Sequence, residues 1–235
     1  MIFNGIEKDY ITVLRGRMRP FFAPLIRDKK FDSHLVKTDR GHRFIEVPVF
    51  IKYDSLEHFR TLTEDIAEWL VHDEPKVLSF KDEPDRLYYA LVDDTMNEDF
   101  LYNTGTESVI KFICGYKYSQ ERTIQATGNH TIAGHTSTPW KSKTTFTSNV
   151  TGYELQFNAP GKTALRDINK IVINYNFIVG DILEIDYSKR RITVNGNDIS
   201  NALVIIQSNY RELDVGIVRF EASHETDVFY HERYY

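Results

Sequence analysis

Hydrophobic residues at spacings of three and four predict one amphipathic helix, which we place at residues 55–71. Asp54 or Ser55 can cap its first turn, and Glu57 then completes a capping box. Pro75 favours an end shortly before it, because the residue preceding a proline avoids helical dihedrals. The charged residues lie off the apolar stripe, so the helix needs a sheet against which to bury that face. The expected core anchors are Phe59, Leu62, Ile66 and Trp69.

Short apolar runs predict the strands of this sheet. Asp82–Asp85 reads as a tight turn that joins two of the strands into a hairpin. Pro48 lies inside another strand and predicts an edge position or a bulge there, because proline cannot donate to a sheet ladder. The expected strands are residues 9–15, 44–53, 77–80, 87–92 and 107–118.

The second half of the chain consists almost entirely of strand and turn patterns, with no long helical period. Regularly spaced short strands of this kind favour an antiparallel sandwich. Residues 119–145 are rich in threonine, serine and glycine and show little periodicity, so we expect an exposed arm and a domain boundary near residue 130. The strands expected after this arm are residues 153–157, 168–177, 182–187 and 191–195.

Several short sequence motifs follow one another from the end of the expected helix to the second strand of the hairpin. They are Trp69-Leu70, Leu78-Ser79-Phe80, Asp82-Glu83-Pro84-Asp85-Arg86 and Tyr89-Ala90. Together they resemble the signature of siphophage distal tail (Dit) proteins, which are hub proteins at the tail tip of phages with long flexible tails. Residues 180–196 resemble a strand pair of the galectin-like jelly roll found in many members, and residues 227–235 resemble the family's ending.

The patterns and this resemblance imply a mainly β fold. An N-terminal β-sandwich-like sheet with one α-helix and a β-hairpin would precede an antiparallel galectin-like jelly-roll β-sandwich. The expected domains are a ring-forming belt domain at 1–130 and a galectin-like sandwich at 131–220. The terminal strand at 221–235 would pack back on the first domain, as it does in some members of the family.

The resemblance also implies a function: a hexameric ring that joins the tail tube to the tip and host-adsorption apparatus of a phage virion and lets DNA pass without binding it. The implied partners are further copies of the chain, the tail tube protein, a tail-tip protein and receptor-binding proteins. We expect synthesis in the host cytoplasm, no membrane contact and no signal peptide. The alternative is a carbohydrate-binding module that recognises cell-wall polysaccharide through the C-terminal sandwich. The second half, however, lacks both a tryptophan after Trp140 and the His-x-Asn-x-Arg strand of true galectins.

The net charge of −5 conceals two opposite blocks. Residues 1–51 carry a charge of +4 and residues 52–107 carry −10. A closed ring joins two different patches of each subunit, so opposite blocks suit such an interface. An alternative use of the acids is to line a central hole and repel DNA. The interface candidates are Arg15, Arg17 and Arg19 on the basic side, with Asp82, Glu83, Asp85, Asp93 and Asp94 on the acidic side.

We expect no enzyme activity, no cofactor and no metal site. The sequence contains no nucleophile elbow, phosphate loop or zinc-protease motif. Cys114 is the single cysteine and lies in an apolar run, which is typical of a buried strand residue. His130 and His135 are five residues apart and have no cysteine or carboxylate beside them to complete a metal site. No apolar run approaches the roughly 20 residues that span a bilayer.

Overall fold

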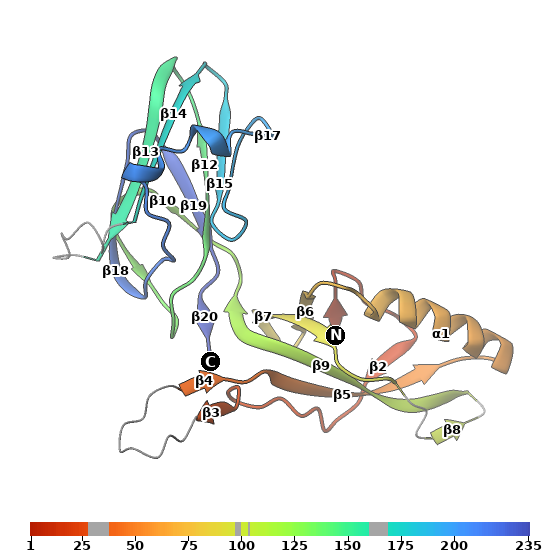
Figure 1. Ribbon diagram of the computed structural model, residues 1–235. Coiled ribbons are helices and arrows are strands. Elements are labelled where there is room, and N and C mark those ends of the chain that lie inside the picture. Colours follow the sequence, from red (N-terminus) through yellow and green to blue (C-terminus); the bar gives the residue numbers. More distant parts are fainter. Residues whose placement is uncertain (28–37, 97–99, 103, 160–168) are drawn as a thin grey trace. The chain divides into compact units, whose positions relative to one another are not determined.

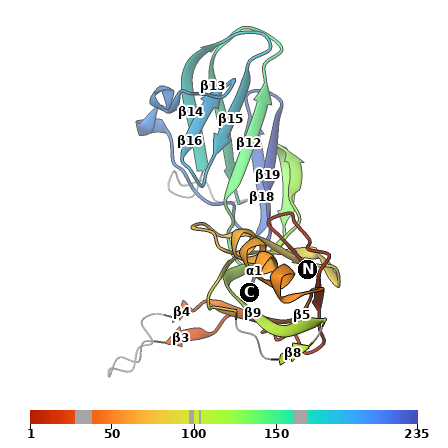
Figure 2. The same cartoon turned by 90° about the vertical axis from the view of Figure 1, so that its right-hand side faces the viewer.

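The computed structural model describes residues 1–27, 38–96, 100–102, 104–159 and 169–235. This part of the chain forms two compact units, Met1–Tyr118 together with Tyr235, and Ser119–Tyr234. Both units are built mainly from antiparallel strands, as the sequence predicts, and the described residues contain one α-helix. Figures 1 and 2 show each unit from two directions.

The main sheet of the first unit has the strand order β1–β6–β7–β9–β5–β2, with β8 added to β9 and with β3 and β4 forming a separate pair. The helix α1 (Leu56–Leu70) lies over one face of this sheet (Figures 1 and 2). The strands are β1 (Ile2–Phe3), β2 (Ile11–Val13), β3 (Leu25–Arg27), β4 (Thr38–Arg40), β5 (Arg43–Lys52), β6 (Lys76–Phe80), β7 (Glu83–Val92), β8 (Phe100–Tyr102) and β9 (Gly105–Ser119).

Helix α1 begins at a serine cap. The Ser55 side chain accepts a hydrogen bond of 3.1 Å from the backbone N–H of His58, so Ser55 rather than Asp54 is the N-cap. The helix ends at Leu70, after which Val71 is extended. Trp69 donates from its indole Nε1 to the carbonyl of Phe3 at 3.0 Å, which ties the helix to β1. The four expected anchors are buried in one core with the sheet: Phe59, Leu62, Ile66 and Trp69.

Strand β5 alternates between the core and the outer face, with Ile45, Val47, Val49 and Ile51 buried. It pairs with β9 along its whole length and with β2 on its other side, so it is an interior strand rather than the expected edge. Pro48 is tolerated because its nitrogen faces the β2 side. On that side strand β2 ends at Val13. The Pro48 carbonyl accepts a hydrogen bond of 2.8 Å from the Leu14 N–H there, and no N–H is needed from Pro48.

The second unit is a β-sandwich of two sheets. One has the order β10–β19–β12–β15–β16–β17, and the other has the order β11–β18–β13–β14. Two short 3₁₀ helices, η2 (Ser200–Ala202) and η3 (Ile205–Gln207), follow β17. The strands of these two sheets are β10 (Arg122–Gln125), β11 (Thr127–Ile132), β12 (Trp140–Thr145), β13 (Val150–Asn158), β14 (Asn169–Phe177), β15 (Ile182–Asp186), β16 (Arg191–Val194), β17 (Asn197–Asp198), β18 (Gly216–Ala222) and β19 (Thr226–Tyr230). The short strand β20 (Arg233–Tyr234) belongs to neither of them.

Residues 119–145 are not an exposed arm. They contribute β10, β11 and β12, which pair with β19, β18 and β15 respectively. Their weak periodicity arises because β10 and β11 expose most of their polar side chains and obtain their order from backbone pairing. The first unit accordingly ends at Tyr118, whereas the sequence placed the boundary near residue 130. Packing of the terminal strand on the first domain stays a prediction, and residue 168 of an expected strand lies outside the described residues.

The second unit has one hydrophobic core, to which both of its sheets contribute. Trp140 is buried and donates from Nε1 to the carbonyl of Arg211 at 2.9 Å, which mirrors the arrangement of Trp69 in the first unit. Side chains from both sheets meet around it, among them Leu155, Ile185 and Phe220. The buried hydroxyl of Tyr153 has hydrogen-bond partners in the hydroxyls of Thr144 and Thr226.

Candidate functional site: charged and apolar surfaces of the first unit

The segment that contains Arg15, Arg17 and Arg19 (the arginine segment) lies against strand β5. Met18 exchanges two backbone hydrogen bonds with Glu46, each of 3.0 Å, so its neighbours Arg17 and Arg19 project to the same side. Gly16 has a φ of 94°, a left-handed value that turns the chain just before this pairing. Gly16 interrupts the extended run that their spacing suggested. Arg15 nevertheless lines one surface hollow together with Arg17 and Arg19.

Arg17 and Arg19 both reach the turn between β6 and β7. Arg17 forms an ion pair with Asp82, and Arg19 forms one with Glu83. The Arg17 guanidinium also lies over the ring of Phe80, 4.0 Å from its centroid. The Arg17 hydrogen bond holds the pKa of the Asp82 carboxyl below its usual range. These contacts connect the basic segment to the acidic turn inside one chain.

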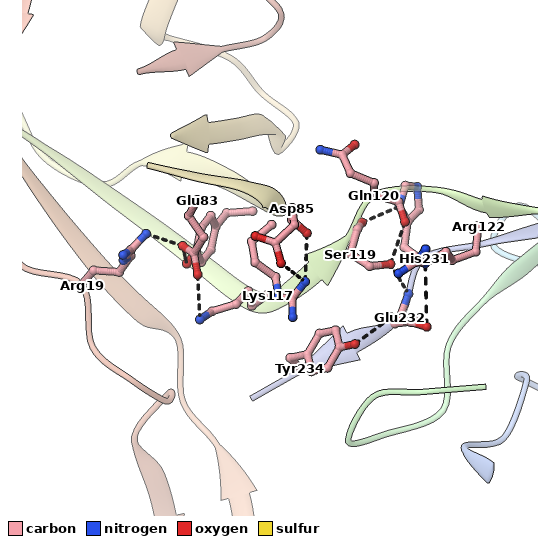
Figure 3. Close-up of polar contacts among 12 residues, drawn as sticks. Arg19, Glu83, Asp85, Lys117, Ser119, Gln120, Arg122, His231, Glu232 and Tyr234 are labelled. Atoms are coloured by element: carbon pink, nitrogen blue, oxygen red, sulfur yellow. Dashed lines mark hydrogen bonds and ion pairs between the residues drawn. The ribbon is translucent and has the colours of Figure 1, made fainter. Parts of the chain in front are cut away.

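Glu83 is the centre of a small network. Its carboxylate accepts from Arg19, from the Lys117 ammonium at 3.2 Å and from the Tyr88 hydroxyl at 2.9 Å. Figure 3 shows Arg19 and Lys117 both directed at this carboxylate. Burial raises the pKa of Tyr88 well above its usual range and the Glu83 contact raises it further, so Tyr88 remains a neutral donor. Glu83 thus holds together β7, β9 and the arginine segment.

The remaining acidic candidates also have mostly local partners. Asp85 pairs with Arg86 at 2.7 Å, and Asp94 pairs with Lys111 at 3.1 Å, a contact that lowers the pKa of Asp94. Four of the five expected interface acids therefore have a cation in their own chain, and their role at a subunit interface stays a prediction. Among the described residues, Arg15 and Asp93 are the candidates left without an ion pair.

An apolar groove runs beside helix α1. Its floor includes Phe59, Ile66 and Leu70 from the helix, and Val92 and Met96 line the opposite wall. Its volume is about 630 Å³, which is in the range of small-molecule and side-chain pockets. The acidic residues Asp93 and Asp94 lie on its rim, and the exposed side chains of Thr63, Ala67 and Val71 form the helical edge.

The described residues contain no group of histidine, cysteine and carboxylate side chains placed to hold a metal ion. His130 donates from Nε2 to the carbonyl of Thr127, 2.9 Å away, and its ring packs against Phe220. His135 lies instead against the ring of Tyr234. Cys114 is buried on β9, and burial raises its thiol pKa to about 11, so it is no nucleophile at neutral pH. No helix in the described ranges is both long and apolar enough to cross a bilayer.

Sequence reasoning missed two parts of this surface. Lys117 and Tyr88 became functional candidates only through their contacts with Glu83, because each sits in a strand pattern with no charge motif. The groove was also missed, since its two walls come from separate stretches of the chain, Phe59 to His72 and Val92 to Met96. One local signal was available: Phe21 and Phe22 lie between Pro20 and Pro24, outside any buried pattern, and such a pair can be suspected of facing solvent.

The described structure combines two β-rich units with paired surface charges and an apolar groove. Two family models match the chain in order: a phage tail protein RIFT-related domain at residues 27–114 and a siphovirus-type tail component, C-terminal domain, at residues 133–234. A curated relative, the distal tail protein of Bacillus phage SPP1, is 28% identical over 225 residues, which cover 91% of this chain and 86% of the relative.

Solved structures share the fold. The crystal structure of the SPP1 Dit protein, described as a paradigm of the hub adsorption apparatus in phages that infect Gram-positive bacteria, aligns with a TM-score of 0.79 at 20% identity. The alignment covers 100% of this chain and 98% of that one. A chain of the phage P2 baseplate in its activated conformation with Ca aligns with a TM-score of 0.65 at 9% identity, covering 95% and 91%.

The chain belongs to the siphophage distal tail protein family. Its role is that of a structural component of a phage tail.

Proposed function

We propose that this protein forms a closed hexameric ring through its first unit, and that the ring joins the tail tube to the tip and host-adsorption apparatus while letting DNA pass. The observation that carries the proposal is the similarity of nearly the whole chain to a distal tail protein, with 91% of the chain aligned. Hexamerisation follows the family resemblance. The partners are the tail tube protein, a tail-tip protein and receptor-binding proteins, and the protein has no catalytic role.

The first unit suits the ring because it presents different surfaces. A cyclic interface brings one patch of a subunit against a second patch of the next. Arg15 and Asp93, the candidates without an ion pair among the described residues, have opposite sign and lie on two different parts of the unit. Exposed ion pairs contribute only about 0–1 kcal/mol each, so apolar burial supplies most of the affinity.

The second unit is proposed as a docking platform for proteins. Its outer hollow is lined by Lys141, Lys143, Glu184 and Asp186, which already form cross-strand ion pairs at 3.2 and 3.7 Å. A sugar site needs free polar groups beside an aromatic stacking surface, and these charges are engaged with each other. Exposed aliphatic side chains on the same unit, such as Ile205 and Ile206, suit protein contacts instead.

Light scattering after size exclusion, followed by negative-stain imaging, tests the ring. We expect a mass of about six chains and particles with a central hole. A purified protein that stays monomeric from micromolar to high micromolar concentration contradicts the proposal. A glycan array tests the alternative, and specific binding through the second unit would replace the docking platform with a carbohydrate-binding role.

A further inference from the structure

The first unit exposes a short aromatic segment, Met18–Phe22. The side chains of Phe21 and Phe22 are 92% and 62% exposed, and Met18 is 57% exposed. Pro20 restricts the backbone between them, and the carbonyl of Phe21 lies 3.5 Å from the guanidinium of Arg43. Two adjacent phenylalanines that are held in water in this way are typical of a surface that another protein covers.

The same unit contains a receptor for such side chains. The groove beside α1 has an apolar floor, and Val71 at its edge is 72% exposed. Its volume of about 630 Å³ is sufficient for aromatic side chains. The floor residues Phe59, Ile66 and Leu70 are themselves buried, so the groove is a formed feature of the core and not a loose surface.

Charge distinguishes the two surfaces and supports their pairing. The aromatic segment follows Arg15, which has no ion pair within the described part of the unit. The groove is bordered by Asp93, the acidic candidate that likewise lacks one there. The other candidate charges are neutralised within the chain. A positive charge on the segment that leads into the phenylalanines therefore complements a negative charge on the rim of the groove.

We propose that Phe21 and Phe22 of one copy insert into the groove between α1 and Val92–Met96 of the next copy, with Arg15 directed at Asp93. This inference rests on the proposed ring and specifies which surfaces join its subunits. The contact is heterologous, as a closed ring requires, because knob and groove are different parts of the same unit.

A disulfide cross-link tests the geometry. Cys114 is buried, so a variant with Phe22→Cys and Ala67→Cys carries its reactive thiols at the segment and at the exposed edge of the groove. Mild oxidation should give a ladder of covalent oligomers on a non-reducing gel. The matched control pairs Phe22→Cys with Glu57→Cys, which is also exposed on α1 but does not line the groove. We expect no ladder from it.

Substitutions test the energetics. Phe21→Ser with Phe22→Ser should lower the ring fraction at least tenfold, whereas Ile205→Ser with Ile206→Ser, equally exposed in the second unit, should leave it unchanged. Arg15→Glu and Asp93→Arg should each weaken assembly a few-fold, and the double variant should restore it. All variants are compared for unchanged circular dichroism and melting.

The outcomes separate this inference from the ring itself. Rings that form without a cross-link, and that survive the two serine substitutions, overturn the knob and groove while the ring stands. Loss of binding to the tail tube protein with intact rings also overturns it, because the segment would then belong to that partner. A wild-type protein that forms no ring at any concentration overturns the proposed function first, and this inference with it.

Discussion

The two units treat their apolar surface differently. The second closes two sheets on one core, and its outer hollow of about 370 Å³ is lined mainly by charged side chains such as Lys141 and Asp186. The first covers one face of a sheet with a single helix, and the groove beside that helix is apolar. The charges of that hollow are paired with each other within one chain. An open apolar groove on the unit that also exposes Phe21 is what an assembling subunit needs.

Substituting the buried tryptophan of each unit separately should give the largest effects on stability. Trp69→Ala and Trp140→Ala each remove a buried indole and its hydrogen bond to a backbone carbonyl, at Phe3 and Arg211 respectively. Each should lower the free energy of unfolding of its own unit by about 3–5 kcal/mol. Calorimetry should show each variant shifting one transition.

Assembly distinguishes the two tryptophan variants. Trp69→Ala should abolish rings, because α1 forms the groove, whereas Trp140→Ala should still form them. Loss of rings in both variants would show that the second unit is also required, and the proposed division of roles between the units would then be wrong.

A glycine in the second unit offers the next largest effect. Gly134 has a φ of 117°, and a Cβ there would lie 2.8 Å from the carbonyl oxygen of Arg233. Gly134→Ala should cost about 2–4 kcal/mol through strain and overpacking. Gly128→Ala is the matched control, with a φ of 71° and open space around it, and should cost only about 1 kcal/mol. Equal melting temperatures for the two variants would show that the close approach to Arg233 does not contribute.

The charges give a smaller contrast. Glu83→Gln leaves Arg19 and Lys117 around a neutral amide, so we expect a loss of about 1–3 kcal/mol from the first unit. Glu184→Gln removes a half-exposed pair with Lys143 and should cost less than about 1 kcal/mol. Chemical denaturation measures both. A larger effect at Glu184 would mean that the convergent network in the first unit is no stronger than ordinary surface pairing.

Acid should destabilise the first unit slightly more than the second. Lys8 and Tyr10 lower the pKa of Asp65, and Arg17 lowers that of Asp82, from the usual 3.8. In the second unit, hydrogen bonds from Ser200 lower the pKa of Asp198. A carboxyl with a lowered folded-state pKa stabilises the protein above 3.8, and this contribution is lost as the pH falls below that value.

The expected difference in melting temperature is small, about 1–4 °C, because these carboxylates are exposed. Calorimetry from pH 5 downward should show the melting temperature of the first unit falling further than that of the second. Asp65→Asn should reduce the fall in the first unit. A larger fall in the melting temperature of the second unit would contradict the claim that these ion pairs stabilise the first unit.

The amino-acid sequence by itself determined the helix, the strands with a clear apolar period and the buried faces of both. The spacing of Phe59, Leu62, Ile66 and Trp69 specified one buried helical face, and the alternation in residues 44–53 specified the core side of β5. These are local properties, because the periods of helix and strand decide which side chains point together. The family resemblance was also readable, since it lies in short contiguous motifs.

Only the tertiary structure decided which charges meet and where the surface is open. The sequence marked Asp82 and Glu83 as candidates for a subunit interface. In the structure, the turn at the β6–β7 junction brings them to Arg17 and Arg19, which are more than 60 positions earlier in the sequence. The weakly patterned residues 119–145 became strands because distant partners satisfy their backbone groups. The groove likewise exists only once α1 lies beside β7 and β9. Ion pairs, ladders and cavities depend on separation in space, which a local pattern does not contain.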